Sequence, residues 1–318
     1  MTEMLYGLDA AERERVAALR GEGRFFWLDV SLSETSRDDL VDALRIPERA
    51  LRALASSGDA STSPTFHADR ESVVFALRCH LETEAPAEEA AYRLRPVEVH
   101  VMITGDYLLT LHEERISLPA VLAPELTEER SKPYVVYAVL GAMLATTSDA
   151  LAEIERRLDA IGVAWAEDGG GRVPSRTTLR ETGPRLATMR RRVSAEQAVV
   201  ARIGMEIGAL RGFDAHDEPY FDRLYEQVNR LLASIDAALN AMAMLLDLQL
   251  NERAYVVSVV ATIFVPLTLL TGFFGMNFGW MVDQIDTPIA FWLLGFIGPA
   301  AVALLCWRFL VRRFVISA

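Results

Sequence analysis

Residues 263–278 read IFVPLTLLTGFFGMNF, and this stretch decides the fold. It lies in an uncharged run that extends over residues 254–282. At about 1.5 Å per helical residue, the part up to residue 274 spans roughly 30 Å, which is enough to cross a lipid bilayer. A second uncharged run follows after a short polar segment. We therefore expect a transmembrane hairpin, with spans at about 254–274 and 288–307 and an outer loop at 275–287.

The distribution of arginine gives the orientation of this hairpin. Arginines stand at the two ends that lie on the same side of the membrane: Arg253, Arg308, Arg312 and Arg313. The connecting loop contains Asp283 and Asp286 and no Lys or Arg. By the positive-inside rule, we expect a multi-pass protein of the plasma (inner) membrane whose N-terminus and short basic C-terminal tail are cytoplasmic. The charged segment 12–24, with no apolar signal-peptide core before it, agrees with this orientation.

The composition of the chain excludes several classes of protein. Its 318 residues contain 32 basic and 44 acidic side chains, a formal charge of -12, which argues against nucleic acid as a partner and favours attraction of cations. Lys132 is the only lysine, so a Walker A motif is absent and a P-loop ATPase is excluded. Cys79 and Cys306 make no disulfide framework. No catalytic constellation is evident, so we do not expect an enzyme.

The segment before the membrane divides into two parts of different character. Residues 1–130 mix short strands and helices, which predicts a cytoplasmic α/β domain. Residues 131–253 carry long helical patterns, which predict a cytoplasmic stalk, and residues 254–318 hold the hairpin. The expected strands lie at 25–30, 72–79, 92–104 and 107–112, with Gly105-Asp106 as a hairpin turn, and the expected helices lie at 36–45 and from Pro47 through 54.

Three helices are expected in the stalk. The first covers residues 134–163, the second begins near Pro184 and reaches Leu210, and the third begins at Asp217 with Pro219 in its first turn. The third helix has no Gly or Pro before the first span, so it is expected to continue into the membrane. Its apolar residues follow a seven-residue repeat, which predicts coiled-coil-like packing: Phe221, Leu224, Val228, Leu231, Ile235, Ala238, Met242 and Leu245.

The third helix is also acidic. Residues 217–252 contain seven Asp or Glu and two Arg, a net charge of -5 (two minus seven). Two interpretations stay open: a solvated stalk surface, or a vestibule that attracts cations. Asp283 and Asp286 in the outer loop likewise either raise the local concentration of cations or form an ordinary polar turn.

One face of the first span carries small or polar residues. Steps of three and four from Asn251 select this stripe: Ala254, Ser258, Ala261, Val265, Thr268, Gly272 and Gly275. Small-residue packing between membrane helices would use the same stripe. The polar members favour a pore, because polar groups are costly when they face lipid. A two-helix hairpin encloses no lumen, so a pore requires several copies of the chain.

Gly275-Met276-Asn277 at the outer end of a first span, after Pro266-Leu267-Thr268, resembles the CorA family of divalent cation channels. The resemblance covers the whole plan of the chain. It implies a homopentameric funnel that conducts Mg²⁺, and in some members Co²⁺ or Ni²⁺, down the electrochemical gradient, with no cofactor besides the transported or regulatory cation. It implies that Gly275, Met276 and Asn277 form the selectivity filter, and that the pore is lined by Asn251, Ala254, Val257, Ala261, Val265, Thr268 and Gly272.

The resemblance has departures and a second branch. Magnesium-transporting relatives often have an acidic residue soon after the motif, whereas Gly279-Trp280-Met281 stands here. In the segment similar to the family's Mg²⁺-sensing site, Arg223 takes the Asp position, which leaves Asp222 and Glu226 as candidate regulatory ligands. The runs 251–255 (NERAY) and 77–79 (LRC) look more like the ZntB branch. A zinc transporter, with or without proton coupling, is therefore an alternative, and a membrane-anchored, non-conducting scaffold is a remote one.

Overall fold

The computed structural model describes residues 3–46, 50, 66–82, 94–122, 131–167, 176–276, 279 and 287–315. The chain forms two compact units, of which the first comprises the described residues up to Met242 and the second those from Ala243 onward. The helix expected from Pro47 lies outside the described residues except for Ala50. The three-segment division expected from the sequence stays a prediction.

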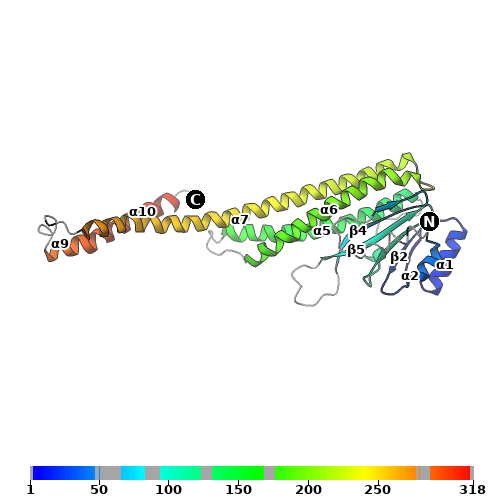
Figure 1. Ribbon diagram of the computed structural model, residues 1–318, viewed down its shortest axis with the longest axis horizontal. Helices are drawn as coiled ribbons and strands as arrows, with labels where there is room; N and C mark the ends of the chain where they lie inside the picture. The colour runs from blue at the N-terminus through cyan, green and yellow to red at the C-terminus, as the bar shows by residue number, and fades with distance from the viewer. Residues whose placement is uncertain are drawn as a thin grey trace. The chain divides into compact units, whose positions relative to one another are not determined.

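A mixed six-stranded sheet lies at the centre of the first unit (Figure 1). The strand order is β1-β2-β6-β5-β4-β3, in which β1, β2 and β6 are parallel and β6, β5, β4 and β3 are antiparallel. Gly105-Asp106 connects β5 to β6, so the predicted hairpin is confirmed. The strands are β1 Glu3–Tyr6, β2 Phe26–Ser31, β3 Phe66–Ala68, β4 Ser72–Glu82, β5 Leu94–Thr104 and β6 Tyr107–His112.

Two short helices cover one face of this sheet. Asp9 caps α1 (Ala10–Gly21) by accepting a hydrogen bond from the Glu12 N–H at 2.8 Å, and Ser36 caps α2 (Arg37–Leu44). Side chains alternate along a strand, so every second residue of β2 points to these helices. The resulting core includes Phe26, Leu28 and Val30 of β2 with Val16, Leu19, Leu40 and Leu44 of the helices.

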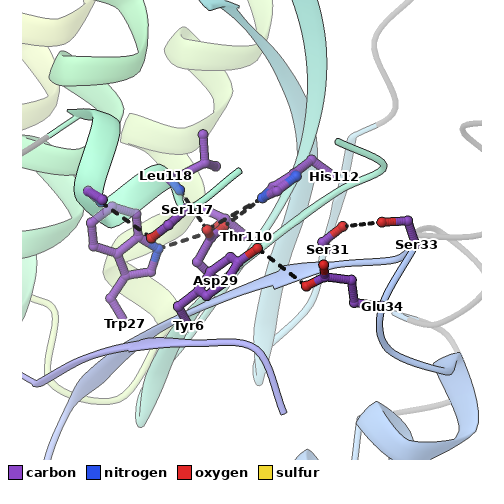
Figure 2. A network of polar contacts seen from close by, with 11 residues as sticks. Tyr6, Trp27, Asp29, Ser31, Ser33, Glu34, Thr110, His112, Ser117 and Leu118 are labelled. Carbon is purple, nitrogen blue, oxygen red and sulfur yellow. Dashed lines mark hydrogen bonds and ion pairs between the residues drawn. The ribbon is translucent and has the colours of Figure 1, made fainter. Parts of the chain in front are cut away.

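The intervening residues of β2 enter a buried polar network (Figure 2). Asp29 is fully buried; its carboxylate accepts hydrogen bonds from Thr110 Oγ1 at 2.6 Å and from the Leu118 N–H at 2.8 Å. His112 Nε2 lies 3.2 Å from the same carboxylate, and Trp27 Nε1 donates to Thr110 Oγ1 at 3.0 Å. The network therefore ties β2, β6 and the start of α4 (Leu118–Leu122) together.

Three long helices pack side by side in the first unit (Figure 1). They are α5 (Lys132–Glu167), α6 (Arg176–Glu206) and α7 (Glu218–Phe274), with 3₁₀ turns at Ile207–Ala209 and Ala215–Asp217 before α7. The expected start of α6 near Pro184 is wrong, because the helix begins at Arg176 and contains Pro184. Pro184 lacks the N–H that would donate to the carbonyl four residues earlier, yet α6 continues through it.

Helix α7 is continuous over 57 residues, as expected from the absence of Gly and Pro before Pro266. The first six residues of its predicted repeat, Phe221 through Ala238, are buried, whereas Met242 and Leu245 are half-buried. Gln227 Nε2 donates to the carbonyl oxygen of Gly141 in α5 at 3.1 Å. Asp217, expected as the cap of α7, closes a capping box with Asp214 around the 3₁₀ turn that precedes this helix.

The C-terminal segment is helical, although it is not one regular α-helix. It comprises α9 (Pro288–Trp292), a π-helical turn at Leu293–Ile297, and α10 (Gly298–Val315). The Gly298 N–H donates to the Leu293 carbonyl, and Pro299 has no N–H to restore the α-helical pattern. The segment expected as the second span is thus helical, and its helix continues past residue 307 to Val315.

Within the described residues, four apolar helical segments are to be considered as membrane spans. Lys132–Ala164 and Glu218–Asn251 satisfy both length and hydropathy, whereas Val257–Phe273 and Leu293–Arg308 are apolar but shorter. Lys132–Ala164 belongs to α5, one of the packed helices of the first unit, and Glu218–Asn251 carries several acidic residues. The shorter two expose large apolar side chains, such as Leu269 at 73% and Leu304 at 68%, which is typical of helices that face lipid. The latter pair are therefore the candidate spans.

The buried carboxylate of Asp29 gives a first test of this fold. Asp29→Ala leaves Thr110, His112 and the Leu118 N–H without their partner, so we expect the free energy of unfolding to fall by about 3 kcal/mol. The measurement is urea unfolding of the full chain in mild detergent, followed by circular dichroism. Asp42→Ala, an exposed change on α2, is the control and should leave the midpoint unchanged. Equal midpoints for the two variants would contradict the structural role of the network.

Candidate functional site

The seven residues predicted to line the pore, here called the pore stripe, lie on α7 in the second unit. At 3.6 residues per turn, its members fall within an arc of about 120° of the helix. All of them are exposed in the single chain, including Val257 at 68% and Val265 at 66%. The members brought to this face are Asn251, Ala254, Val257, Ala261, Val265, Thr268 and Gly272.

An open groove runs along the outer half of this stripe. Its volume is about 570 Å³, and it contains Val265, Thr268 and Gly272. Larger apolar side chains complete the lining: Phe264, Leu269, Phe273 and Met276. A Cβ placed on Gly272 would meet no other atom within 4 Å, so the middle of the groove is hollow because this residue has no side chain. This part of the helix face therefore borders open space in the single chain.

The hydroxyl groups near the groove are satisfied within the helix. Thr262 Oγ1 donates to the Ser258 carbonyl at 2.7 Å, Thr268 Oγ1 to the Phe264 carbonyl at 2.8 Å, and Thr271 Oγ1 to the Leu267 carbonyl at 3.0 Å. The lone pairs of these oxygens remain as acceptors. A polar acceptor on an otherwise apolar helix suits contact with water or with the water shell of a cation.

The three-residue motif begins where α7 ends. The Gly275 N–H donates to the Thr271 carbonyl at 3.0 Å, and the Met276 N–H donates to the Phe273 carbonyl at 3.3 Å. A Cβ on Gly275 would lie 3.0 Å from the Thr271 carbonyl oxygen, which is too close without a local shift. The structure thus places two of the three predicted filter residues at the end of the groove. Asn277 and the loop residues Asp283 and Asp286 lie outside the described residues.

The candidate regulatory ligands lie on α7 in the first unit. Asp222 and Glu226 are exposed and one helical turn apart. Glu226 Oε2 lies 3.6 Å from Arg230 Nη1, which is an exposed pair of small energetic weight. Within the part of the chain that the structure describes, no group of three or more His, Cys, Asp and Glu could hold a metal ion. A metal site at these residues would require ligands from another chain, so their role stays a prediction.

Two features were missed by reasoning from the sequence. The stripe on α7 extends one helical turn earlier than Asn251, to the exposed Asp247, and the same three-and-four spacing would have found it. Asp29, Thr110 and His112 come together although more than 80 residues separate Asp29 from the other two. All three are fully buried, so this cluster is closed to a substrate and is structural.

Comparisons with known proteins match this chain to metal-ion transport proteins. Residues 22–313 match the family described as CorA-like Mg2+ transporter protein. The cobalt/magnesium transport protein CorA of Thermotoga maritima is 23% identical over 190 residues, which is 56% of this chain and 52% of that protein. The zinc transport protein ZntB of Yersinia enterocolitica is 27% identical over 123 residues, which is 36% of this chain and 37% of that protein.

Solved structures share the fold over a longer part of the chain. The CorA magnesium transporter from Methanocaldococcus jannaschii has a TM-score of 0.58 at 18% identity, covering 91% of this chain and 90% of that one. Full-length CmaX has a TM-score of 0.57 at 20% identity, covering 90% and 87%. The cytoplasmic domain of ZntB from Vibrio parahaemolyticus has a TM-score of 0.55 at 13% identity, covering 72% and 88%.

The family profile matches most of the chain, and the chain therefore belongs to the CorA-like Mg²⁺ transporter family. The resemblance drawn from the sequence is confirmed. The sequence matches span about half or less of the length of the curated relatives named above. At identities of 13–20%, the structural neighbours show a common fold and leave ion selectivity open.

Gly272 lies inside α7 and Gly275 follows its last residue, so alanine substitutions at the two positions can be compared directly. Gly275→Ala forces a Cβ against the Thr271 carbonyl oxygen, whereas Gly272→Ala places it in open space and improves helix propensity. We expect Gly275→Ala to be the less stable of the two by about 1 kcal/mol. The measurement is the thermal loss of helical circular dichroism in mild detergent. Identical melting temperatures would show that the end of α7 does not require glycine.

Proposed function

We propose that this chain is the subunit of a channel that conducts divalent metal cations, Mg²⁺ above all and also Co²⁺ or Ni²⁺, across the plasma membrane. The observation that carries the proposal is the exposed groove of α7, which has small and polar residues at its centre and ends at Gly275-Met276. Family membership and the two apolar helices support it. Both termini are then cytoplasmic, in agreement with the arginines at the inner ends of the spans.

The pore requires several copies of the chain. The face of α7 with the groove is open in one subunit, and a hairpin of two helices cannot enclose a channel. Five copies around one axis, each presenting this face, give a lumen lined by the first spans, with the second spans outside. Val257 and Val265 then form apolar rings, which gate a pore by excluding water when the rings are narrow.

The chemistry of the proposed filter suits a hydrated ion. Mg²⁺ holds its water at about 2.1 Å and gives it up reluctantly, so the ion enters with its first shell in place. A ring of Asn277 amides offers neutral oxygens to those waters and binds the ion weakly enough to release it. Thr268 adds a further acceptor along the wall. Carboxylates at the filter would hold the ion more tightly.

The membrane potential alone can drive this transport. A divalent cation gains about 4.6 kcal/mol per 100 mV of inside-negative potential, twice the value for a single charge. No nucleotide motif is then needed. Asp283 and Asp286 in the outer loop raise the local concentration of cations, and Asp222 and Glu226 are candidate ligands for a regulatory cation held between subunits.

Flux through liposomes tests the filter. Asn277→Ala removes the ring of amide oxygens, so we expect Mg²⁺ flux to fall at least about tenfold, in the range of a few kcal/mol of lost stabilisation. The measurement uses purified full-length protein, an inside-negative potential and a Mg²⁺-sensitive dye. Ser194→Ala, an exposed change on α6, is the control. Equal flux in both would end the assignment of Asn277; a monomeric or dimeric particle in mild detergent would favour a non-conducting scaffold.

Zinc transport is the second candidate function. The sequence segments 251–255 and 77–79 favour it, and a zinc transport protein is among the sequence relatives. If the proposal for Mg²⁺ is right, side-by-side flux assays should show saturable Mg²⁺ uptake that is unchanged by a pH gradient. Zn²⁺ uptake that responds to the pH gradient, together with no Mg²⁺ flux, would select the zinc alternative. The same assay with Co²⁺ and Ni²⁺ defines the rest of the selectivity.

A further inference from the structure

A second cavity lies wholly within the first unit, between α5, α6 and the strands β4 and β5. Its volume is about 650 Å³, within the range of pockets that hold small organic molecules. None of the residues assigned to the pore, the filter or the regulatory metal lines it. Four arginines do: Arg78, Arg95, Arg185 and Arg192.

The cavity exists because β4 is longer than its neighbour β3. The short strand β3 pairs with β4 only at residues 73–75, and among the described residues no other strand pairs with this edge of β4. Side chains of the helices satisfy it instead. The Arg78 N–H donates to Glu196 Oε1 of α6 at 3.1 Å, and the His80 N–H donates to Thr146 Oγ1 of α5 at 2.9 Å. These bonds hold the two helices beside the sheet and leave the space between them.

Ionisation in the cavity reflects its positive arginines. Burial, and then the charges of Arg192 and Arg78, lowers the pKa of His80 to about 4, so its ring is neutral. Burial and the neighbouring Arg78 also lower the pKa of Arg192. Burial raises the pKa of Glu196 to about 7, which weakens the negative charge on the cavity floor. An anion at the arginines would therefore relieve repulsion between like charges.

Three acidic residues, Glu114, Glu153 and Glu196, also line the cavity, against its four arginines. Glu153 forms an ion pair with Arg157 at 2.9 Å, outside the lining. Arg78 pairs with Glu98 at 2.9 Å, so an anion would share that guanidinium. Arg185 and Arg192 are exposed on the same face of α6. A basic cavity is notable in a chain whose formal charge is -12, because nonspecific attraction of anions to the whole surface is weak.

The remaining lining restricts the size of the ligand. Apolar side chains make up much of it, including Val97, Ile154, Met189 and Val193, and the hydroxyl groups of Thr147 and Thr188 are also present. An inorganic anion would fill a small part of 650 Å³ and leave the apolar side chains uncovered. An organic body attached to the anion would cover them.

We propose that this cavity is a binding site for a small organic phosphate. Arg78, Arg185 and Arg192 hold the phosphate oxygens, since guanidinium groups bind phosphate through paired hydrogen bonds. The organic body lies against Ile154, Met189 and Val193 of α5 and α6. No residue that lines this cavity is among those assigned to the pore, the filter or the regulatory metal.

Calorimetric titration of the full chain in mild detergent, without divalent cations, tests the proposal. The probes are adenosine monophosphate, which has a phosphate and an organic body, and inorganic phosphate, which has the phosphate alone. We expect saturable binding of adenosine monophosphate and at least tenfold weaker binding of inorganic phosphate. Arg192→Gln and Arg185→Gln should each raise the dissociation constant at least fivefold. Arg180→Gln, the same change at an exposed position of α6 outside the cavity, should leave it within twofold.

Two further readings distinguish loss of the site from loss of the fold. Thermal unfolding of each variant without ligand should match that of the wild type, and Arg192→Lys should bind with intermediate affinity, because lysine keeps the charge but loses the paired geometry. No saturable binding of either probe, or equal binding by Arg192→Gln and Arg180→Gln, would overturn the proposal. The assay measures no ion flux, so its failure would leave the proposed channel function unaffected.

Discussion

The structure depends on the continuity of one long helix, α7, between its two units. No Gly or Pro occurs between Pro219 and Pro266, so the chain cannot turn there at low cost. In the first unit, the repeat from Phe221 to Ala238 is buried against α5 and α6. In the second, the stripe from Asn251 to Gly272 is exposed. One continuous helix therefore contributes a packed face to the first unit and an exposed face to the second.

Much of this architecture could be predicted because it rests on local periodicity. The repeats of α5 and α7, the β5–β6 hairpin and the apolar C-terminal helix follow from spacing alone. The errors have local causes of a different kind. The sequence predicts a helix start near Pro184, whereas the structure has this residue inside α6. The π-helical turn before Gly298 follows from a missing N–H at Pro299, which a hydropathy pattern does not register.

Features that join distant parts of the chain could not be predicted. The pore-lining set rests on the spacing along one helix and on the family resemblance, so it could be proposed from the sequence, and its role stays a prediction. The Asp29 network and the bond from Arg78 to Glu196 each connect segments about a hundred residues apart. Their formation requires the order of strands in the sheet and the placement of α6, and neither follows from the spacing of residues along the chain. This is why the basic cavity had no signal in the sequence.

Ion pairs offset part of the acidic charge of α7. Arg190, one of three consecutive arginines in α6, binds Asp236 at 2.5 Å, and Arg230 lies near Glu226. Asp236 and Glu226 are thus partly neutralised by these two arginines. The charge count of residues 217–252 omits Arg190, and it counts Arg230 without pairing it to Glu226. Glu218, Asp222 and Asp247 of α7 are also acidic and exposed. Asp247 shares the helix face of the residues proposed to line the pore, so in the proposed channel it is the one of these three best placed to act on a passing cation.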